Sequence, residues 1–411
     1  MINIVELFSG AGGLVEGFLE AGFNPVACIE KNRDACMTLR TRHVRWKLKN
    51  DKKIHIYHDY LKKNITREDL YGLLETDPVI NTEISKDTLD SIDLGIRHRM
   101  AESGIKKIDI FIGGPPCQTF SIAGRSRKND ISCDSRTHLY LYYAELLKRF
   151  KPEIFIFENV TGILSAKFNG ALIFEKIKEE FYSAGYCLDF RILNAGDFGV
   201  LQNRRRVIII GWKKKLDMKY PEFKKVNYEF QVFDLFSDIP SVKPGCNDML
   251  QKYKSEPSEY LLKTRIREKQ FDILTWNVSR PVNKTDRTIY RIAVEKWNNE
   301  KIRLNYAELP EKLRTQANTS SFGDRYKVVA GDIPRSHTLV AHIAKDGHYY
   351  IHPDIKQNRS LSVREAARIQ SFPDDYFFEG SRTSAFMQIG NAVPPLMARG
   401  IAKKIKEMFN G

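Results

Sequence analysis

The chain has 411 residues, of which 42% are hydrophobic and 28% are charged, which is typical of a folded protein long enough for two domains. Its formal net charge is +15, which favours nucleic acid over a membrane as its partner. No apolar run approaches the length of a membrane span, and the N-terminus lacks the basic and apolar regions of a signal peptide, so we expect an intracellular, cytoplasmic protein. The six cysteines include no Cys-x-x-Cys pair and no zinc-like Cys/His group, which argues against a disulfide framework and against a structural metal.

The first elements predict the start of a doubly wound α/β fold. Residues 2–7 form an apolar strand, residues 8–13 (Phe-Ser-Gly-Ala-Gly-Gly) form a glycine-rich turn, and a helical apolar pattern follows. The turn is not a dinucleotide fingerprint, because Val15 stands where a third glycine would be, and it is not a P-loop, since it lacks Gly-Lys-Ser/Thr. A second strand, residues 25–29, ends in Glu30, whose carboxylate suits two ribose hydroxyls.

A third strand is predicted at residues 53–57, and His58, Asp59 and Tyr60 follow it directly. The polar and partly helical segment that comes next, residues 61–107, is long for a connection between strands, and its charged residues are most simply a solvated face. A short apolar run rich in β-branched residues, 108–112, then predicts a buried strand.

The strand at residues 108–112 ends abruptly in residues 113–117, Gly-Gly-Pro-Pro-Cys. Two glycines and two prolines make a stiff turn, and in an open α/β sheet such turns line the ligand crevice. The thiol of Cys117 is therefore placed to attack a bound ligand. The alternative is that Cys117 is a small buried hydrophobic residue, as free cysteines often are. Residues 121–137 are rich in Gly, Ser, Arg and Asp, which predicts a mobile loop.

Two more groups of polar side chains lie next to predicted strands. Apolar residues at helical spacing predict a helix at residues 139–150, and the strand at residues 154–157 leads directly into Glu158-Asn159-Val160. Glu158 is either a salt-bridged structural acid or a functional one. The sequence Gln202-Asn203-Arg204-Arg205-Arg206 precedes another strand. Successive arginines are usually solvated or face phosphate, but beside a thiol one of them can reach a substrate.

The regular βα alternation ends with the first domain, residues 1–212. Residues 213–335 scatter Lys and Arg among aromatic residues with no clean period, which predicts a separate, irregular domain. Residues 336–411 return to the first domain. There a Ser-x-x-Glu capping box opens a helix at residue 362, and a Gly/Pro turn at residues 388–395 precedes a last amphipathic helix.

Taken together and in this order, the motifs resemble the DNA (cytosine-5)-methyltransferase family, most closely the bacterial modification enzymes of restriction systems. The Phe-Ser-Gly-Ala-Gly, Pro-Cys, Glu-Asn-Val, Gln-x-Arg-x-Arg and Gly-Asn-Ala-Val-Pro segments each look like one family motif. The resemblance implies a doubly wound, Rossmann-like sheet of the kind found in S-adenosylmethionine-dependent methyltransferases, with residues 213–335 as a smaller target-recognition domain. The segment between Asp59 and Gly113 is longer than in compact family members.

The resemblance also implies which residues serve the cofactor and the reaction. The positions implied to bind S-adenosylmethionine are Phe8, Ser9, Gly10, Gly12, Glu30, Asp59, Pro115 and Asn391. Among these, Glu30 would bind the ribose hydroxyls and Asp59 the adenine. The positions implied to be catalytic are Cys117, Glu158, Arg204 and Arg206.

These residue types suit methyl transfer to C5 of cytosine, which is a poor nucleophile. Addition of the Cys117 thiolate to C6 makes an enamine-like ring whose C5 attacks the methyl group. A Glu158 carboxyl kept neutral by burial would donate to N3, while Arg204 and Arg206 would serve O2 or the adjacent phosphate. The target base must be flipped out of the duplex, and no single residue is required as the base that removes the C5 proton.

We therefore expect double-stranded DNA as the partner of a monomeric, bacterial, nucleoid-associated enzyme. A cognate restriction endonuclease would act on the same site without forming a stable complex. A cytosine-5 RNA methyltransferase and a catalytically dead DNA-binding relative are the alternatives. An N-methyltransferase is disfavoured, because the chain has no Asp/Asn-Pro-Pro-Tyr/Phe motif.

Overall fold

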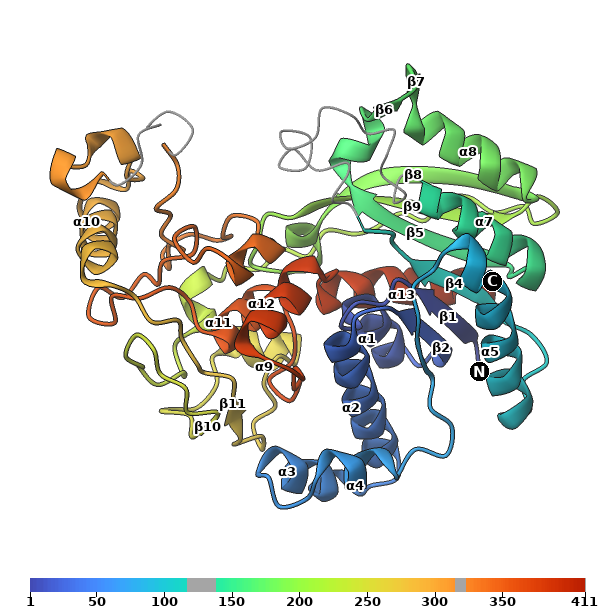
Figure 1. Cartoon of the computed structure of the whole chain (residues 1–411), viewed down its shortest axis with the longest axis horizontal. Coiled ribbons are helices and arrows are strands. Elements are labelled where there is room, and N and C mark those ends of the chain that lie inside the picture. Colours follow the sequence, from blue (N-terminus) through green and yellow to red (C-terminus); the bar gives the residue numbers. More distant parts are fainter. Residues whose placement is uncertain (117–137, 315–322, 411) are drawn as a thin grey trace.

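A seven-stranded sheet forms the centre of the protein (Figure 1). The computed structural model describes residues 1–116, 138–314 and 323–410. In chain order the sheet strands are β1 (Asn3–Leu7), β2 (Asn24–Glu30), β3 (Val79–Asn81), β4 (Ile110–Gly113), β5 (Ile154–Val160), β8 (Tyr186–Asn194) and β9 (Arg205–Lys213). Their order across the sheet is β3-β2-β1-β4-β5-β9-β8; the first five are parallel, and β9 is antiparallel to both of its neighbours. The strand order reverses between β1 and β4, where such sheets bind ligands.

Helices cover both faces of the sheet, so the predicted doubly wound fold is confirmed. One face carries α1 (Gly13–Glu20), α2 (Arg33–Asn50) and α13 (Pro395–Asn410), and the other carries α5 (Leu89–Glu102), α7 (Leu139–Phe150) and α8 (Ile173–Ser183). Neighbouring residues of β4 point in opposite directions: Ile110 packs with the first group and Phe111 with the second. Both faces of the central strands are buried, which is why these strands have continuous rather than alternating apolar residues.

The strand predicted at residues 53–57 is wrong, because this segment is the helix α3 (Ile54–Leu61). Its buried residues Tyr57 and Leu61 are four apart and pack against α2 and α4 (Arg67–Tyr71). The alternating Ile-His-Ile that suggested a strand is overridden by this packing. The true third strand, β3, has only three residues and lies within the segment for which we predicted no strand.

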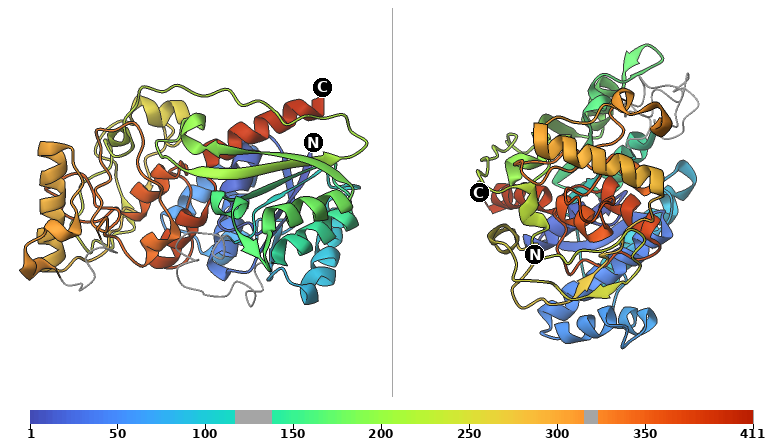
Figure 2. Two further views of the ribbon diagram at one scale, coloured as in Figure 1. Left: turned by 90° about the horizontal axis from the view of Figure 1, so that it is seen from above. Right: turned by 90° about the vertical axis from the view of Figure 1, so that its left-hand side faces the viewer.

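The region from residue 213 to 335 contains short elements among loops. These are α9 (Glu259–Thr264), the two-residue strands β10 (Leu250–Gln251) and β11 (Leu274–Thr275), and the longer helix α10 (Lys284–Glu300). The left view of Figure 2 places the orange helix α10 at the end of the molecule farthest from the sheet. Buried residues on both sides of residue 335, such as Trp276 and Leu361, share one core, so the packing continues across that expected boundary.

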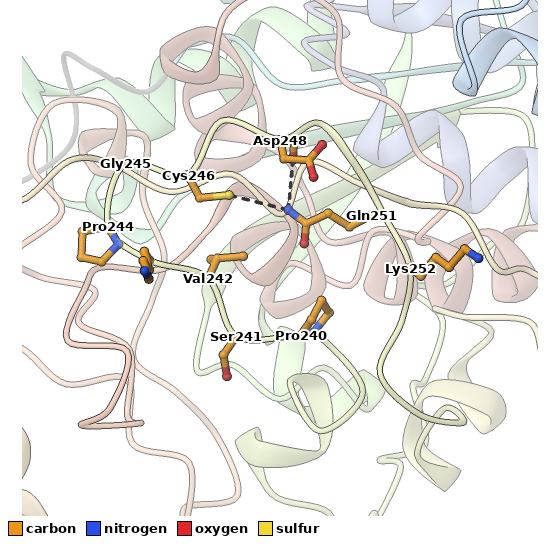
Figure 3. Close-up of a pocket in the computed structure, with 10 residues that line it drawn as sticks. Pro240, Ser241, Val242, Pro244, Gly245, Cys246, Asp248, Gln251 and Lys252 are labelled. Carbon is orange, nitrogen blue, oxygen red and sulfur yellow. Dashed lines mark hydrogen bonds between the residues drawn. The ribbon is translucent and has the colours of Figure 1, made fainter.

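A shallow, open hollow lies on this region and is lined by residues between 240 and 252 (Figure 3). Inside it the Gln251 amide donates to the backbone carbonyl of Asp248 at 3.1 Å and approaches the Cys246 sulfur at 3.7 Å. None of its lining residues belongs to the central sheet. The hollow is therefore separate from the ligand crevice of the α/β fold.

The C-terminal segment contributes two short helices before α13. The predicted capping box is confirmed, since Ser362 and Glu365 cap α11 (Val363–Ile369). Residues 388–391, predicted as part of a turn, are instead the last turn of α12 (Arg382–Asn391), and only the residues from Ala392 to Pro394 form the turn. No helix in the described ranges is long and apolar enough to cross a membrane.

Candidate active site

A cavity of about 310 Å³ opens at the carboxyl edge of the parallel strands. Its walls come from the residues that end five strands, from the start of β9 and from α12. Of the predicted site residues, the cavity brings together Phe8, Ser9, Gly10, Glu30, Pro115, Glu158, Arg206 and Asn391. Gly12, Asp59 and Arg204 lie outside its lining, and Cys117 lies outside the described residues.

The glycine-rich turn passes through the left-handed region of backbone conformation at three positions, Phe8 with a φ of +56°, Gly10 and Gly12. Gly10 and Gly12 have φ values of +54° and +81°, in the left-handed region. A Cβ on Gly12 would also lie 2.7 Å from Leu39 of α2. Gly12 is the N-cap of α1, so it shapes the turn from behind while Ser9 and Gly10 face the cavity.

Glu30 is held rigidly at the end of β2. Its Oε2 accepts the backbone N–H of Gly10 at 2.8 Å, and its Oε1 accepts that of Asn32 at 2.8 Å. One carboxylate therefore ties the glycine turn to the start of α2. Each oxygen keeps a lone pair for a ligand hydroxyl, as the ribose prediction requires.

Asp59 does not lie where the prediction placed it. It sits on α3, and its carboxylate accepts from the Asn64 amide at 3.2 Å. The residues that line the cavity after the real third strand are Thr82, Glu83 and Ile84. Sequence reasoning missed them, although the apolar pair Val79-Ile80 followed by a carboxylate was a usable signal.

The described part of the Gly-Gly-Pro-Pro turn confirms a strand end at this position. A Cβ on Gly114 would lie 2.4 Å from the carbonyl oxygen of Glu158 and 2.6 Å from its Oε2, so only glycine lets the turn lie against β5. Asn159, which is 1% exposed, donates its side-chain amide to the Pro115 carbonyl at 3.3 Å. Strand β5 thus positions the turn that leads to Cys117.

Glu158 and Arg206 form an ion pair in the cavity wall. The Nε of Arg206 lies 2.8 Å from the Oε1 of Glu158, and the side chains are 10% and 15% exposed. Strands β5 and β9 are antiparallel neighbours, which brings the two motifs together. Glu158 is thus both salt-bridged and in the cavity. Its pairing with a cation differs from the expectation of a carboxyl kept neutral by burial.

Arg204 lies behind the cavity instead of in it. The residue is 1% exposed, and its guanidinium donates to the carbonyls of Leu339, Gly390 and Ala392 at 2.7, 3.2 and 2.9 Å. These contacts hold the end of α12 and its cavity residue Asn391 against β9. They assign Arg204 a positioning role and not the direct substrate contact that we expected.

The cavity also contains residues that the sequence reasoning did not select. Ser384, Met387 and Gln388 line it together with Asn391, at the i, i+3, i+4 and i+7 positions of α12. The helical repeat was the available signal, but the turn predicted over residues 388–391 concealed it. Glu6 of β1 is a further lining residue. Within the described part of the chain, no group of three or more His, Cys, Asp or Glu side chains is placed to hold a metal.

The strand order and the cavity over its switch point define a Rossmann-like methyltransferase fold. Solved structures agree. A prophage-encoded E. coli protein, described as a DNA modification methyltransferase, superposes with a TM-score of 0.66 at 22% identity, covering 100% of both chains. The Dnmt2 methyltransferase of S. pombe superposes with a TM-score of 0.54 at 16% identity, covering 99% of both chains.

The chain belongs to the C-5 cytosine-specific DNA methylase family, which it matches over residues 2–68 and 85–407. It is 39% identical to the type II methyltransferase M.Bpa9945I of Bacillus paralicheniformis, over 99% of both chains. It is 31% identical to the type II methyltransferase M.DdeI of Desulfomicrobium norvegicum, over 99% of this chain and 89% of that one. The predicted family is confirmed, and the protein is a DNA (cytosine-5)-methyltransferase.

Proposed function

We propose that this enzyme transfers a methyl group from S-adenosylmethionine to C5 of a flipped-out cytosine in a specific duplex sequence, through a covalent bond between Cys117 and C6. The observation that carries the proposal is the single cavity that joins the glycine turn and Glu30 to Pro115 and the Glu158–Arg206 pair. Ligand-binding and reactive groups thus share one space, at the switch point of the sheet.

The strand order sets the direction in which the donor would lie. Along the carboxyl edge the lining residues follow the order β3, β2, β1, β4, β5: Glu83, Glu30, Ser9, Pro115 and Glu158. With the ribose at Glu30, the adenine falls toward Glu83, and the methionine part lies over β1 and β4. The methyl group then faces the end of the cavity that holds Glu158. When bound, the donor supplies an electrophilic methyl carbon on a positively charged sulfur.

The protein's own residues would supply the remaining steps. The Cys117 thiolate forms a bond to C6, and N3 takes up a proton that Glu158 relays from solvent, so the ring becomes an enamine. C5 takes the methyl group, and the electron pair of the broken bond stays on the donor sulfur. A base then removes the C5 proton, elimination of the thiolate restores the C5=C6 double bond, and N3 gives its proton back through Glu158. Arg206 holds the Glu158 side chain in place and would face O2 of the base.

Binding of the duplex would rest on the net charge of +15 and on residues 213–335. Phosphate contacts provide affinity, and base contacts in the grooves provide sequence specificity. The relatives named type II methyltransferases support a role in a restriction-modification system, in which methylation protects DNA from an endonuclease of the same specificity. We propose a monomeric enzyme in the bacterial cytoplasm.

The test is methylation of a randomised duplex library, read by a method that resolves 5-methylcytosine, with transfer RNA as a parallel substrate. We expect 5-methylcytosine at one position of one short duplex sequence and none in the RNA. The Cys117→Ala variant should produce none in either substrate. Methylation of the RNA alone, or full activity of Cys117→Ala on the duplex, would refute the proposal.

A further inference from the structure

A buried carboxyl group in the cavity wall has no role in the chemistry above. Glu6 lies on β1 and is 1% exposed, yet it lines the cavity. Its Oε1 accepts the backbone N–H of Val15, in the first turn of α1, at 3.1 Å. Its Oε2 is buried and has no hydrogen-bond partner among the described residues. A buried carboxylate oxygen without a partner is costly and indicates a missing ligand group.

The groups that act on Glu6 include no cation in the described part of the chain. From β2 it faces Glu30 and Cys28, from α7 Tyr143, and from the loop before α12 Tyr376. Burial raises the pKa of Glu6 to about 8; the nearby Ser9 hydroxyl, which donates to the Glu6 backbone carbonyl at 3.1 Å, and the Val15 N–H act in the opposite direction, and the charge of Glu30 raises it further. A positive charge next to Glu6 would therefore pair with a carboxylate that interacts with no other described cation.

The order of residues along the sheet edge places Glu6 next to one part of the donor. Glu6 belongs to β1, between Glu30 of β2 and Pro115 of β4. This step rests on the proposed function, in which the ribose lies at Glu30 and the methyl group faces Glu158. The part of the ligand between those two points is the sulfur, which is a sulfonium in the donor and a neutral thioether in the product.

We propose that Glu6 is the residue by which the enzyme prefers the cationic methyl donor to the neutral product. Its carboxylate attracts the sulfonium, and the attraction disappears when the methyl group leaves. Because the interaction is stronger with the bound donor than with the transition state, it favours donor binding and product release and does not speed the methyl-transfer step. Glu6 is therefore a specificity-determining residue and not a catalytic one.

The experiment is calorimetric titration of the full chain with S-adenosylmethionine and with S-adenosylhomocysteine between pH 6.5 and pH 9. The sulfonium charge lowers the pKa of the donor's amino group relative to that of the product, so the affinity ratio has a pH dependence of its own that is the same in every variant. In the unmodified enzyme we expect the donor-to-product affinity ratio to rise about tenfold more across this range than it does in Glu6→Gln, as Glu6 loses its proton. In Glu6→Gln, whose amide oxygen still accepts from Val15, only the ligands' own amino groups should contribute to the pH dependence.

Glu30→Gln is the matched control. The substitution removes a carboxylate that neighbours Glu6, but the proposed contact of Glu30 is with the ribose, which both ligands carry. It should weaken both ligands by similar factors and leave the pH dependence of their ratio in place. A change of the ratio in Glu30→Gln equal to that in Glu6→Gln would overturn the assignment to Glu6.

If Glu6→Gln does not fold, titration of the two free ligands gives their amino pKa values, and these correct the ratio measured with the unmodified enzyme. A corrected donor-to-product ratio that does not change with pH, in an enzyme that still methylates duplex DNA, refutes this inference and leaves the proposed function intact. Failure to bind either ligand, together with the absence of 5-methylcytosine, refutes the proposed function instead.

Discussion

The substitution Gly114→Ala tests whether the turn before Cys117 must lie directly against β5. The added Cβ would lie 2.4 Å from the carbonyl oxygen of Glu158 and 2.6 Å from its Oε2, whereas ordinary contacts begin at 3.4 Å. The nearer atom belongs to the backbone of a sheet strand and cannot turn away, so the turn itself must move by roughly 1 Å. A misplacement of this size lowers a catalysed rate by about 100-fold.

The assay measures kcat for methylation of a duplex and, separately, the affinity for the methyl donor. We expect kcat to fall about 100-fold and donor affinity to fall less than kcat, because Pro115 moves with the turn while the glycine turn and Glu30 are untouched. Overpacking should also lower the free energy of unfolding by about 1–3 kcal/mol. Gly72→Ala is the control, since its Cβ meets nothing nearer than 3.4 Å at a φ of −60°. A Gly114→Ala enzyme that keeps kcat within twofold would refute the reasoning.

Three further predictions follow from buried charges. Asp238→Ala removes a carboxylate that is 0% exposed and ion-paired with two arginines, so urea denaturation should show a loss of about 3–5 kcal/mol. Arg206→Ala leaves Glu158 without its cation and should lower the rate of single-turnover methylation about 100-fold or more. The control is Arg205→Ala, at an exposed neighbouring residue, which should keep this rate within twofold of that of the unmodified enzyme. Equal rates in the two variants would contradict the prediction. Burial alone would raise the pKa of Asp375, but its two ion pairs with arginines hold that pKa well below its usual range. The ionised Asp375 therefore stabilises the fold above about pH 4, and this stabilisation is lost as the pH falls. Asp375→Asn should accordingly show a smaller drop in melting temperature between pH 6 and pH 3 than the unmodified enzyme.

Most of the central sheet could be predicted from local sequence. Strands β4 and β5 are apolar runs bounded by Gly/Pro turns or polar residues, and this pattern does not depend on distant contacts. The third strand could not be predicted in this way, because β3 has three residues and gains its place only by pairing with β2. For the segment 53–57 the local sequence predicts a strand that does not form. Its alternating apolar and polar residues lie in a helix instead, because Tyr57 packs against α2 and α4.

The sequence by itself determined the family, the glycine turn, Glu30 and the adjacent motifs of β5 and β9, because each is a short segment at the end of a strand. The role of Cys117 remains a prediction. Only the tertiary structure decided which of these side chains share a cavity. It excluded Asp59, placed Arg204 behind the site, paired Glu158 with Arg206 and revealed Glu6. Each of these findings depends on contacts across the edge of the sheet between residues that are far apart in the chain, and the local sequence does not determine such contacts.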